Sequence, residues 1–215
     1  MTLSADLYWS FRSPYSYLAT GRYVQLTRDY DLMINLRVVY PLAIREPNFF
    51  EKNHPNWLGY TMRDVMRLSQ FHGIPMAPPR PDPIVQDMKT RKISDDQPYI
   101  FRLVRLGQAA SRAGKGLEFA DEISQLIWAG TENWHEGGLL AEATARAGLD
   151  LAELDAIADA EAEQLDAEVA ANQAALEEAG HWGVPTLVFD GEPFFGQDRI
   201  DIAVWRMQQA GLQKR

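Results

Sequence analysis

The chain has 215 residues, of which 46% are hydrophobic and 24% charged, and its formal net charge is −9. A chain of this size can bury a full hydrophobic core without disulfides or a structural metal, and its acidity disfavours a nucleic-acid partner because phosphate backbones repel it. Its cysteine count is zero, which excludes disulfides, thiolate metal sites and redox chemistry by thiols of its own.

The N-terminal part predicts a strand, a helix and a second strand. Leu7, Trp9 and Phe11 alternate with more polar neighbours, which is typical of a strand. Residues 14–30 carry apolar side chains at helical spacing. Residues 34–38 alternate again and form the second predicted strand.

Helix-forming residues dominate the middle of the chain, from about 43 to 180. A loop rich in proline and asparagine is expected at 47–55, a helix at 57–72, and an irregular proline-rich run at 74–83. Glycines separate four further predicted helices, which span 96–113, 117–129, 136–147 and 151–179.

The C-terminal part predicts a hairpin and a closing helix. Residues 186–189 are rich in strand formers, Asp190-Gly191 is a strong signal for a two-residue turn, and 193–195 form the returning strand. Apolar side chains after Gly196 follow helical spacing. The whole pattern indicates an α/β protein in which a small mixed sheet is interrupted by an all-helical insertion.

The first strand and helix join at Ser13-Pro14-x-Ser16, where a thioredoxin-like fold would carry a redox Cys-x-x-Cys motif. Serine before a proline commonly begins a helix and stabilises it by about 1 kcal/mol, and on local sequence this is the more frequent role. The same hydroxyl and helix end could instead lower the pKa of a thiolate from its free value of about 8.5. Without cysteine in the chain, that sulfur would arrive with a cofactor.

Two stretches near the C-terminus also allow a structural and a functional interpretation. Val184-Pro185 could form a turn before a strand, or a cis-proline turn that leaves the Val184 backbone free to pair with a peptide-like ligand. Asp198, after Gln197, could cap the last helix, or could bind the ammonium of an amino-acid ligand whose carboxylate lies at the helix start.

Three stretches together resemble the 2-hydroxychromene-2-carboxylate isomerases, a family close to the kappa-class glutathione transferases. They are Phe11-x-Ser13-Pro14-Tyr15-Ser16-Tyr17-Leu18-Ala19, Gly183-Val184-Pro185-Thr186 and Phe195-Gly196-Gln197-Asp198-Arg199. The likeness spans essentially the whole chain. It implies a DsbA-like thioredoxin domain formed by 1–42 and 181–215, a helical insertion domain at 43–180, a homodimer, and glutathione as cofactor.

The resemblance also implies roles for residues on the cofactor side. Ser13 would hold the glutathione sulfur as the catalytic residue, and Val184 beside a cis Pro185 would pair with the cysteinyl backbone. Gln197 and Asp198 would bind the γ-glutamyl end. Two asparagines are further matches for cofactor contacts, the second more loosely: Asn53 and Asn172.

The substrate side departs from the family pattern. Ser10 stands where a typical member has an acidic residue in the first strand, and the basic residue expected near the Asn53 loop has no single counterpart. Three residues are candidates for substrate binding: Arg45, Lys52 and Trp57. A basic side chain here would contact the substrate carboxylate.

The resemblance therefore predicts a glutathione-dependent cis–trans isomerase acting on 2-hydroxychromene-2-carboxylate or a similar aromatic-derived conjugated keto acid. A kappa-type glutathione transferase and a non-catalytic, cysteine-free thioredoxin-like binding protein remain alternatives. The four histidines lack metal-ligand spacing, so we expect no metal. Without a secretory pattern or an apolar membrane span, we expect a cytoplasmic protein with no membrane partner.

Overall fold

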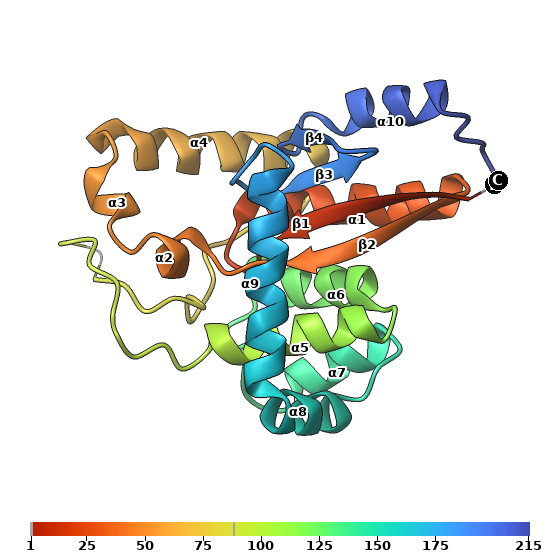
Figure 1. The fold of residues 1–215 in the computed structure, drawn as a ribbon. Coiled ribbons are helices and arrows are strands. Elements are labelled where there is room, and N and C mark those ends of the chain that lie inside the picture. Colours follow the sequence, from red (N-terminus) through yellow and green to blue (C-terminus); the bar gives the residue numbers. More distant parts are fainter. Residues whose placement is uncertain (1, 88) are drawn as a thin grey trace.

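The computed structural model describes residues 2–87 and 89–215, and in it the two ends of the chain build one sheet. The four strands of this sheet lie in the order β2-β1-β3-β4 (Figure 1). They are β1 (Leu3–Trp9), β2 (Leu32–Val38), β3 (Thr186–Phe189) and β4 (Glu192–Phe195). β1 pairs in parallel with β2 and antiparallel with β3, and β3 pairs antiparallel with β4. The predicted mixed sheet is confirmed.

Helices cover both faces of the sheet. Helix α1 (Pro14–Asp29) and helix α10 (Ile200–Gln209) pack on the face that carries Leu7, in the main hydrophobic core. Helix α9 (Ala162–Glu178) crosses the opposite face, where Tyr8 packs with Leu176 (Figure 1). Because successive side chains of a strand point to opposite faces, β1 contributes to both cores.

The hairpin between β3 and β4 has the turn that its sequence predicts. Asp190 and Gly191 both adopt positive φ, at 51° and 76°. This conformation matches the type I′ turn, whose twist suits a two-residue hairpin. The local sequence therefore determines the pairing of these two strands.

The other helices lie between β2 and β3 in the sequence. They are α2 (Leu42–Arg45), α3 (Phe49–Lys52), α4 (Pro55–His72), α5 (Ile100–Arg112), α6 (Gly116–Trp128), α7 (Leu139–Arg146) and α8 (Leu151–Ala160). None of the helices in the described residues is both long enough and apolar enough to cross a membrane. The domain boundaries at 42/43 and 180/181 stay a prediction.

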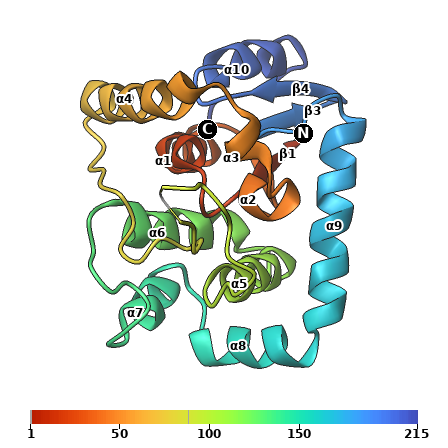
Figure 2. The same cartoon turned by 90° about the vertical axis from the view of Figure 1, so that its left-hand side faces the viewer.

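Three predictions of secondary structure were wrong in detail. The first strand ends at Trp9 and does not reach Phe11. Phe11 lies beyond the strand but is fully buried against Trp9, so its apolar side chain continues the alternating pattern in the sequence. The predicted loop 47–55 contains the short helix α3. The predicted helix 151–179 is broken at Glu161, and α8 and α9 run in clearly different directions (Figure 2). Glu161 pairs there with Arg112, a contact that helix propensity cannot reveal.

Candidate active site

Ser13 caps helix α1, as its local sequence predicts. Its backbone is extended, its Oγ accepts a hydrogen bond from the Ser16 N–H at 3.2 Å, and Pro14 occupies the first helical position. The Ser13 N–H donates to the Ser10 carbonyl at 3.1 Å, which forms the turn between β1 and α1. The hydroxyl therefore lies at the positive end of a 16-residue helix.

The turn before β3 lies next to this cap. The Val184–Pro185 bond is cis, and the Ser13 Oγ lies 3.4 Å from the Val184 carbonyl oxygen. The pairing of β3 with β1 begins only at Thr186, so Val184 precedes the sheet ladder. The Thr186 hydroxyl donates to the Gly183 carbonyl at 2.7 Å and holds the turn. The structure thus brings Ser13, Val184 and Pro185 together from opposite ends of the chain.

Gln197 and Asp198 lie between β4 and α10. Gln197 is buried, and its backbone carbonyl accepts a hydrogen bond from the Arg22 Nη1 at 2.8 Å. Asp198 is exposed and pairs with Arg199 at 2.6 Å. The expectation that Asp198 caps α10 was wrong: the N-cap position is Arg199, and no side chain caps this helix. The Asp198 carboxylate is therefore not used by the backbone of α10.

Asp198 nevertheless acts on the start of α1. Burial, a hydrogen bond from the Tyr15 hydroxyl to Asp64, and the nearby charges of Asp64 and Asp198 together raise the pKa of Tyr15. The backbone also connects these segments, because the Gly196 N–H, two residues before Asp198, donates to the carbonyl of Pro185 at 2.9 Å, next to Val184. The acidic group and the hydroxyl thus belong to one region.

The predicted Asn53 loop borders a cavity that residues 46–49, 52 and 53 line. Lys52 and Asn53 line this cavity of about 330 Å³, and the Asn53 amide donates to the Phe49 carbonyl at 2.7 Å. Trp57 packs against Phe49, their ring centroids 5.4 Å apart, and Phe49 in turn lies 6.1 Å from the Trp182 ring. These aromatic contacts connect the cavity wall to the turn that carries Val184.

Arg45, a candidate substrate contact, is bound to two backbone carbonyls. Its Nε donates to the Tyr40 carbonyl at 2.7 Å and its Nη1 to the Trp182 carbonyl at 3.0 Å. Its Nη2 is buried and has no hydrogen-bond partner among the described residues. Burial lowers the pKa of Arg45, although the charges of Glu46 and Glu177 oppose this. Arg45 therefore links α2 to the turn before Val184.

The structure does not bring Asn172 to this group of residues. Its side chain is buried in α9, and its Nδ2 donates to the Val38 carbonyl at 3.0 Å and to the Gln108 Oε1 at 3.1 Å. It lines a different cavity, of about 570 Å³, which is bounded by β2, α5 and α9 and includes none of the other predicted site residues. The Asn172 amide holds the end of β2.

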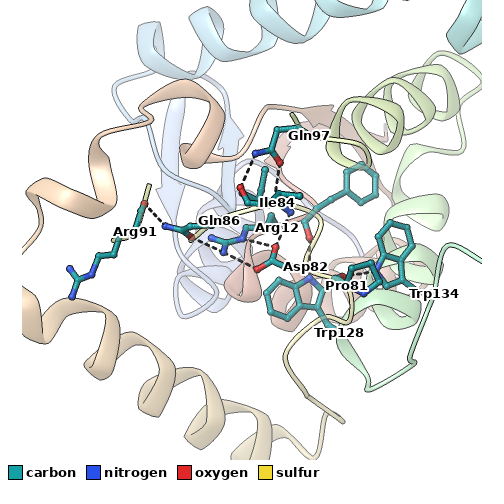
Figure 3. Close-up of polar contacts among 11 residues, drawn as sticks. Arg12, Pro81, Asp82, Ile84, Gln86, Arg91, Gln97, Trp128 and Trp134 are labelled. Carbon is teal, nitrogen blue, oxygen red and sulfur yellow. Dashed lines mark hydrogen bonds and ion pairs between the residues drawn. The ribbon is translucent and has the colours of Figure 1, made fainter. Parts of the chain in front are cut away.

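Sequence reasoning missed the network around Arg12, the residue before Ser13. The Arg12 guanidinium forms a two-point contact with Asp82, at 3.0 and 2.9 Å (Figure 3). It also lies 5.6 Å from the centre of the Phe50 ring. Asp82 also accepts a hydrogen bond from the Ile84 N–H at 2.9 Å. The only signals in the sequence were the motif position of Arg12 and the proline-rich run 74–83.

Two tryptophans complete this network. The Trp128 indole N–H donates to the Phe11 carbonyl at 3.0 Å, and the Trp134 indole N–H donates to the Pro81 carbonyl at 2.8 Å (Figure 3). Side chains from the helical segment therefore hold the Ser13 turn at residues 11 and 12. In the part of the chain that the structure describes, no group of three His, Cys, Asp or Glu residues could hold a metal ion.

Comparisons with known proteins identify the family and the fold of the chain. A family model described as a DSBA-like thioredoxin domain matches residues 5–208. No curated protein gives a significant match. Among solved structures, the chain is similar to a 2-hydroxychromene-2-carboxylate isomerase, with a TM-score of 0.66 and 23% identity over 97% of this chain and 96% of that one.

Two other solved structures share the fold. A probable DsbA oxidoreductase from Streptomyces coelicolor has a TM-score of 0.67 and 17% identity, over 97% of this chain and 89% of that one. The cytosolic disulfide reductase DsbM from Pseudomonas aeruginosa, in a structure with GSH, has a TM-score of 0.61 and 17% identity, over 97% of this chain and 100% of that one. The predicted DsbA-like thioredoxin fold is thereby confirmed.

Proposed function

The chain belongs to the DsbA-like thioredoxin domain family, and from this premise we propose that it is a glutathione-dependent cis–trans isomerase. Its substrate is 2-hydroxychromene-2-carboxylate or a similar aromatic-derived conjugated keto acid. Two similar structures support this proposal, an isomerase named for that substrate and a disulfide reductase determined with GSH. Because the chain has no cysteine, it cannot exchange disulfides through thiols of its own, unlike the oxidoreductases that share its fold.

One observation carries the proposal: the 3.4 Å contact between the Ser13 Oγ and the Val184 carbonyl, beside the cis peptide bond. At this contact the Ser13 hydroxyl, the N-terminus of α1 and the backbone of Val184, which lies outside the sheet ladder, are close together. A short thiol peptide needs these three groups, because its backbone can pair with Val184 like an added strand while its sulfur faces the helix end. The donor set therefore fits glutathione.

The residues of the chain would divide the work as follows. Ser13 donates a hydrogen bond to the sulfur, Val184 pairs with the cysteinyl backbone, and Asp198 binds the γ-glutamyl ammonium. A decrease of two units in the thiol pKa requires about 2.7 kcal/mol. A hydrogen bond to a charged group contributes about 1.5–3 kcal/mol and a helix end about 0.3–1 kcal/mol, so the upper part of their combined range reaches the required value.

When bound, glutathione would supply a thiolate that can add reversibly to the conjugated C=C bond once the hemiketal ring of the substrate has opened, so that the bond could rotate while it is single and re-form when the thiolate leaves. The protein orients the substrate for this step. The rings of Phe49, Phe50 and Trp57 lie within 6.0 Å of one another between centroids and offer an aromatic surface. Lys52, which is exposed beside this cluster, would attract the substrate carboxylate, with Arg45 as the second candidate.

Binding and turnover test the proposal separately. Calorimetry should show glutathione binding, and ultraviolet titration of the bound thiolate should give a pKa below the free value of about 8.5. Chromatography with mass detection should then show 2-hydroxychromene-2-carboxylate converted to an isomer of equal mass, only when glutathione is present. A persistent glutathione adduct would instead identify a kappa-type transferase, and absence of binding would leave Ser13 as a helix cap alone.

We also propose the assembly and domain division that the family resemblance implies. The protein would be a homodimer, in which residues 1–42 and 181–215 form the thioredoxin-like domain and residues 43–180 the helical insertion domain. Light scattering after size-exclusion chromatography tests the oligomeric state, because a monomer would have the mass of one chain, 24.3 kDa. Limited proteolysis tests the domain division, since cuts should concentrate at domain boundaries.

A further inference from the structure

Two buried hydroxyls beside Ser13 have no hydrogen-bond partner. Among the described residues, the Ser10 Oγ and the Ser16 Oγ are both unpartnered, and these residues are only 1% and 0% exposed. A buried polar group without a partner destabilises a protein, and native structures hold few of them. The Ser16 hydroxyl lies in the first turn of the helix that the proposed thiolate donor begins, so a partner for it in the ligand-bound state is of interest.

The hydroxyl of Ser16 is free because its usual partner is already bound. Ser16 is the third residue of α1, where a side chain normally completes a capping box by accepting from the N-cap N–H. Here the Ser13 N–H donates to the Ser10 carbonyl instead. The Ser16 N–H donates to the Ser13 Oγ, and the Ser16 carbonyl accepts from the Thr20 hydroxyl at 2.7 Å. Both backbone groups of Ser16 are therefore satisfied, while its hydroxyl is not.

Ser13 has a weak contact that a ligand can replace. At 3.4 Å, its hydrogen bond to the Val184 carbonyl is longer than an ordinary hydroxyl bond. A peptide N–H that pairs with Val184 would satisfy the same carbonyl. The Ser13 hydroxyl would then be free to donate elsewhere, and its oxygen could accept from a second donor.

We propose, on the basis of the proposed function, that Ser16 is a positioning residue whose hydroxyl donates to the Ser13 Oγ when Ser13 donates to the bound sulfur. Side chains three residues apart at a helix start lie on the same side, so Ser16 is the neighbouring donor along the chain. A hydroxyl that accepts a hydrogen bond becomes a stronger donor itself, because chains of hydrogen bonds polarise one another. Ser16 would thus strengthen the bond that Ser13 makes to the thiolate.

The test is an ultraviolet titration of the thiol of glutathione bound to the wild-type protein and to four variants. Ser16→Ala should raise the pKa of the bound thiol by about half a unit to one unit, which is the size of one neutral hydrogen bond. Ser13→Ala should raise it further, and Ser13→Ala/Ser16→Ala should equal Ser13→Ala, because Ser16 acts through Ser13. Ser10→Ala is the matched control, equally buried and unpartnered, and should leave the thiol pKa unchanged.

Thermal unfolding of the ligand-free variants checks that they fold. Alanine is the better helix former and removes an unpartnered oxygen, so Ser16→Ala should keep or raise the unfolding midpoint. An unchanged thiol pKa in Ser16→Ala would overturn the inference while leaving the proposed function intact. Additive shifts in the double variant, or an equal shift in Ser10→Ala, would also overturn it. If the wild-type protein bound no glutathione, both the proposed function and this inference would fail.

Discussion

The cofactor side of the candidate site and its substrate side are built differently. Ser13 follows the end of β1 and Val184 precedes the start of β3. The pairing of Tyr8 with Thr186 in these two strands determines how far apart they are. The substrate side stands on the four-residue helices α2 and α3, which single side chains such as Arg45 hold in place. Backbone pairing therefore determines the geometry of the cofactor side, whereas a few side chains determine that of the substrate side. Substitutions on the two sides should separate thiol activation from substrate placement.

Ser13→Ala should have the largest effect. Loss of the hydroxyl removes a hydrogen bond to a charged group, worth about 1.5–3 kcal/mol, so kcat/KM should decrease by about tenfold to a hundredfold. Loss of the cap should also lower the free energy of unfolding by about 1 kcal/mol. Asp150→Ala is the control, because Asp150 caps α8 through the N–H groups of Ala152 and Glu153. A similar decrease in kcat/KM for both variants would show that stability alone explains the loss.

Asp198→Asn should weaken glutathione binding without raising the pKa of the bound thiol. Removing the charge that faces the ligand ammonium should raise the Kd for glutathione by about tenfold, measured by calorimetry. The pKa of the bound thiol should not rise, because Ser13 and α1 remain and the loss of a nearby negative charge can only lower it. Asp201→Asn is the control three residues further along the chain, where Asp201 pairs with Arg22. A rise in the thiol pKa in Asp198→Asn would contradict this division of roles.

Asp82→Asn should affect the Ser13 turn through Arg12. It breaks the two-point contact that ties the loop after α4 to the Ser13 turn, so kcat should decrease while the Kd for glutathione stays the same. The free energy of unfolding should decrease by about 1 kcal/mol, since the pair is partly exposed. Asp155→Asn removes the same kind of contact with Arg102, at 2.7 Å, outside the candidate site. If it lowered kcat equally, the link to Ser13 would be disproved.

Lys52→Ala should have a smaller effect that depends on salt. Lys52 is exposed, so its attraction to a substrate carboxylate is worth about 0.5–1 kcal/mol and the KM should rise by a few-fold. The difference from wild type should shrink as ionic strength increases, because salt screens exposed charges. Lys115→Ala, which removes an exposed lysine paired with Glu118, should leave the KM unchanged. A rise in KM that did not depend on salt would argue against a charge contact.

His181, which lies beside the turn that carries Val184, should make the stability of the protein depend slightly on pH. Burial lowers the pKa of His181, and the hydrogen bond that its Nδ1 accepts from the Gly183 N–H also favours the neutral ring. Above about pH 6.5, the ordinary value, histidine is neutral in both states and its contribution to stability is complete. Below that value the unfolded chain binds the proton first, so stability falls until the pH passes the lower pKa of the folded state. Unfolding midpoints of wild type and His181→Asn should diverge only in that window, and parallel curves would disprove this role.

Much of the sheet and of the cofactor side could be predicted, because short-range signals determine them. Alternation identified the strands, Asp190-Gly191 identified the hairpin turn, and the serine–proline step identified the start of α1. The sequence pattern before Thr186 also suggested the cis bond that the structure shows. Each of these depends on a few neighbouring residues.

The wrong predictions share a physical cause. Helix propensity runs unbroken through Glu161, but the chain turns there, where Glu161 pairs with Arg112 of α5. Asp198 has the residue type of a cap, yet α10 begins two residues later. In both cases contacts with distant residues override a local preference.

The sequence by itself determined the order of the elements, the absence of a thiol and the two turns that flank the candidate site, since these follow from residue identity and neighbours. Only the tertiary structure decided that the Ser13 hydroxyl meets the Val184 carbonyl, that Arg12 binds Asp82, and that Arg45 holds the Trp182 carbonyl. Those partners are 171, 70 and 137 residues apart in the chain. Such contacts depend on how packed layers align, which no single stretch of sequence specifies.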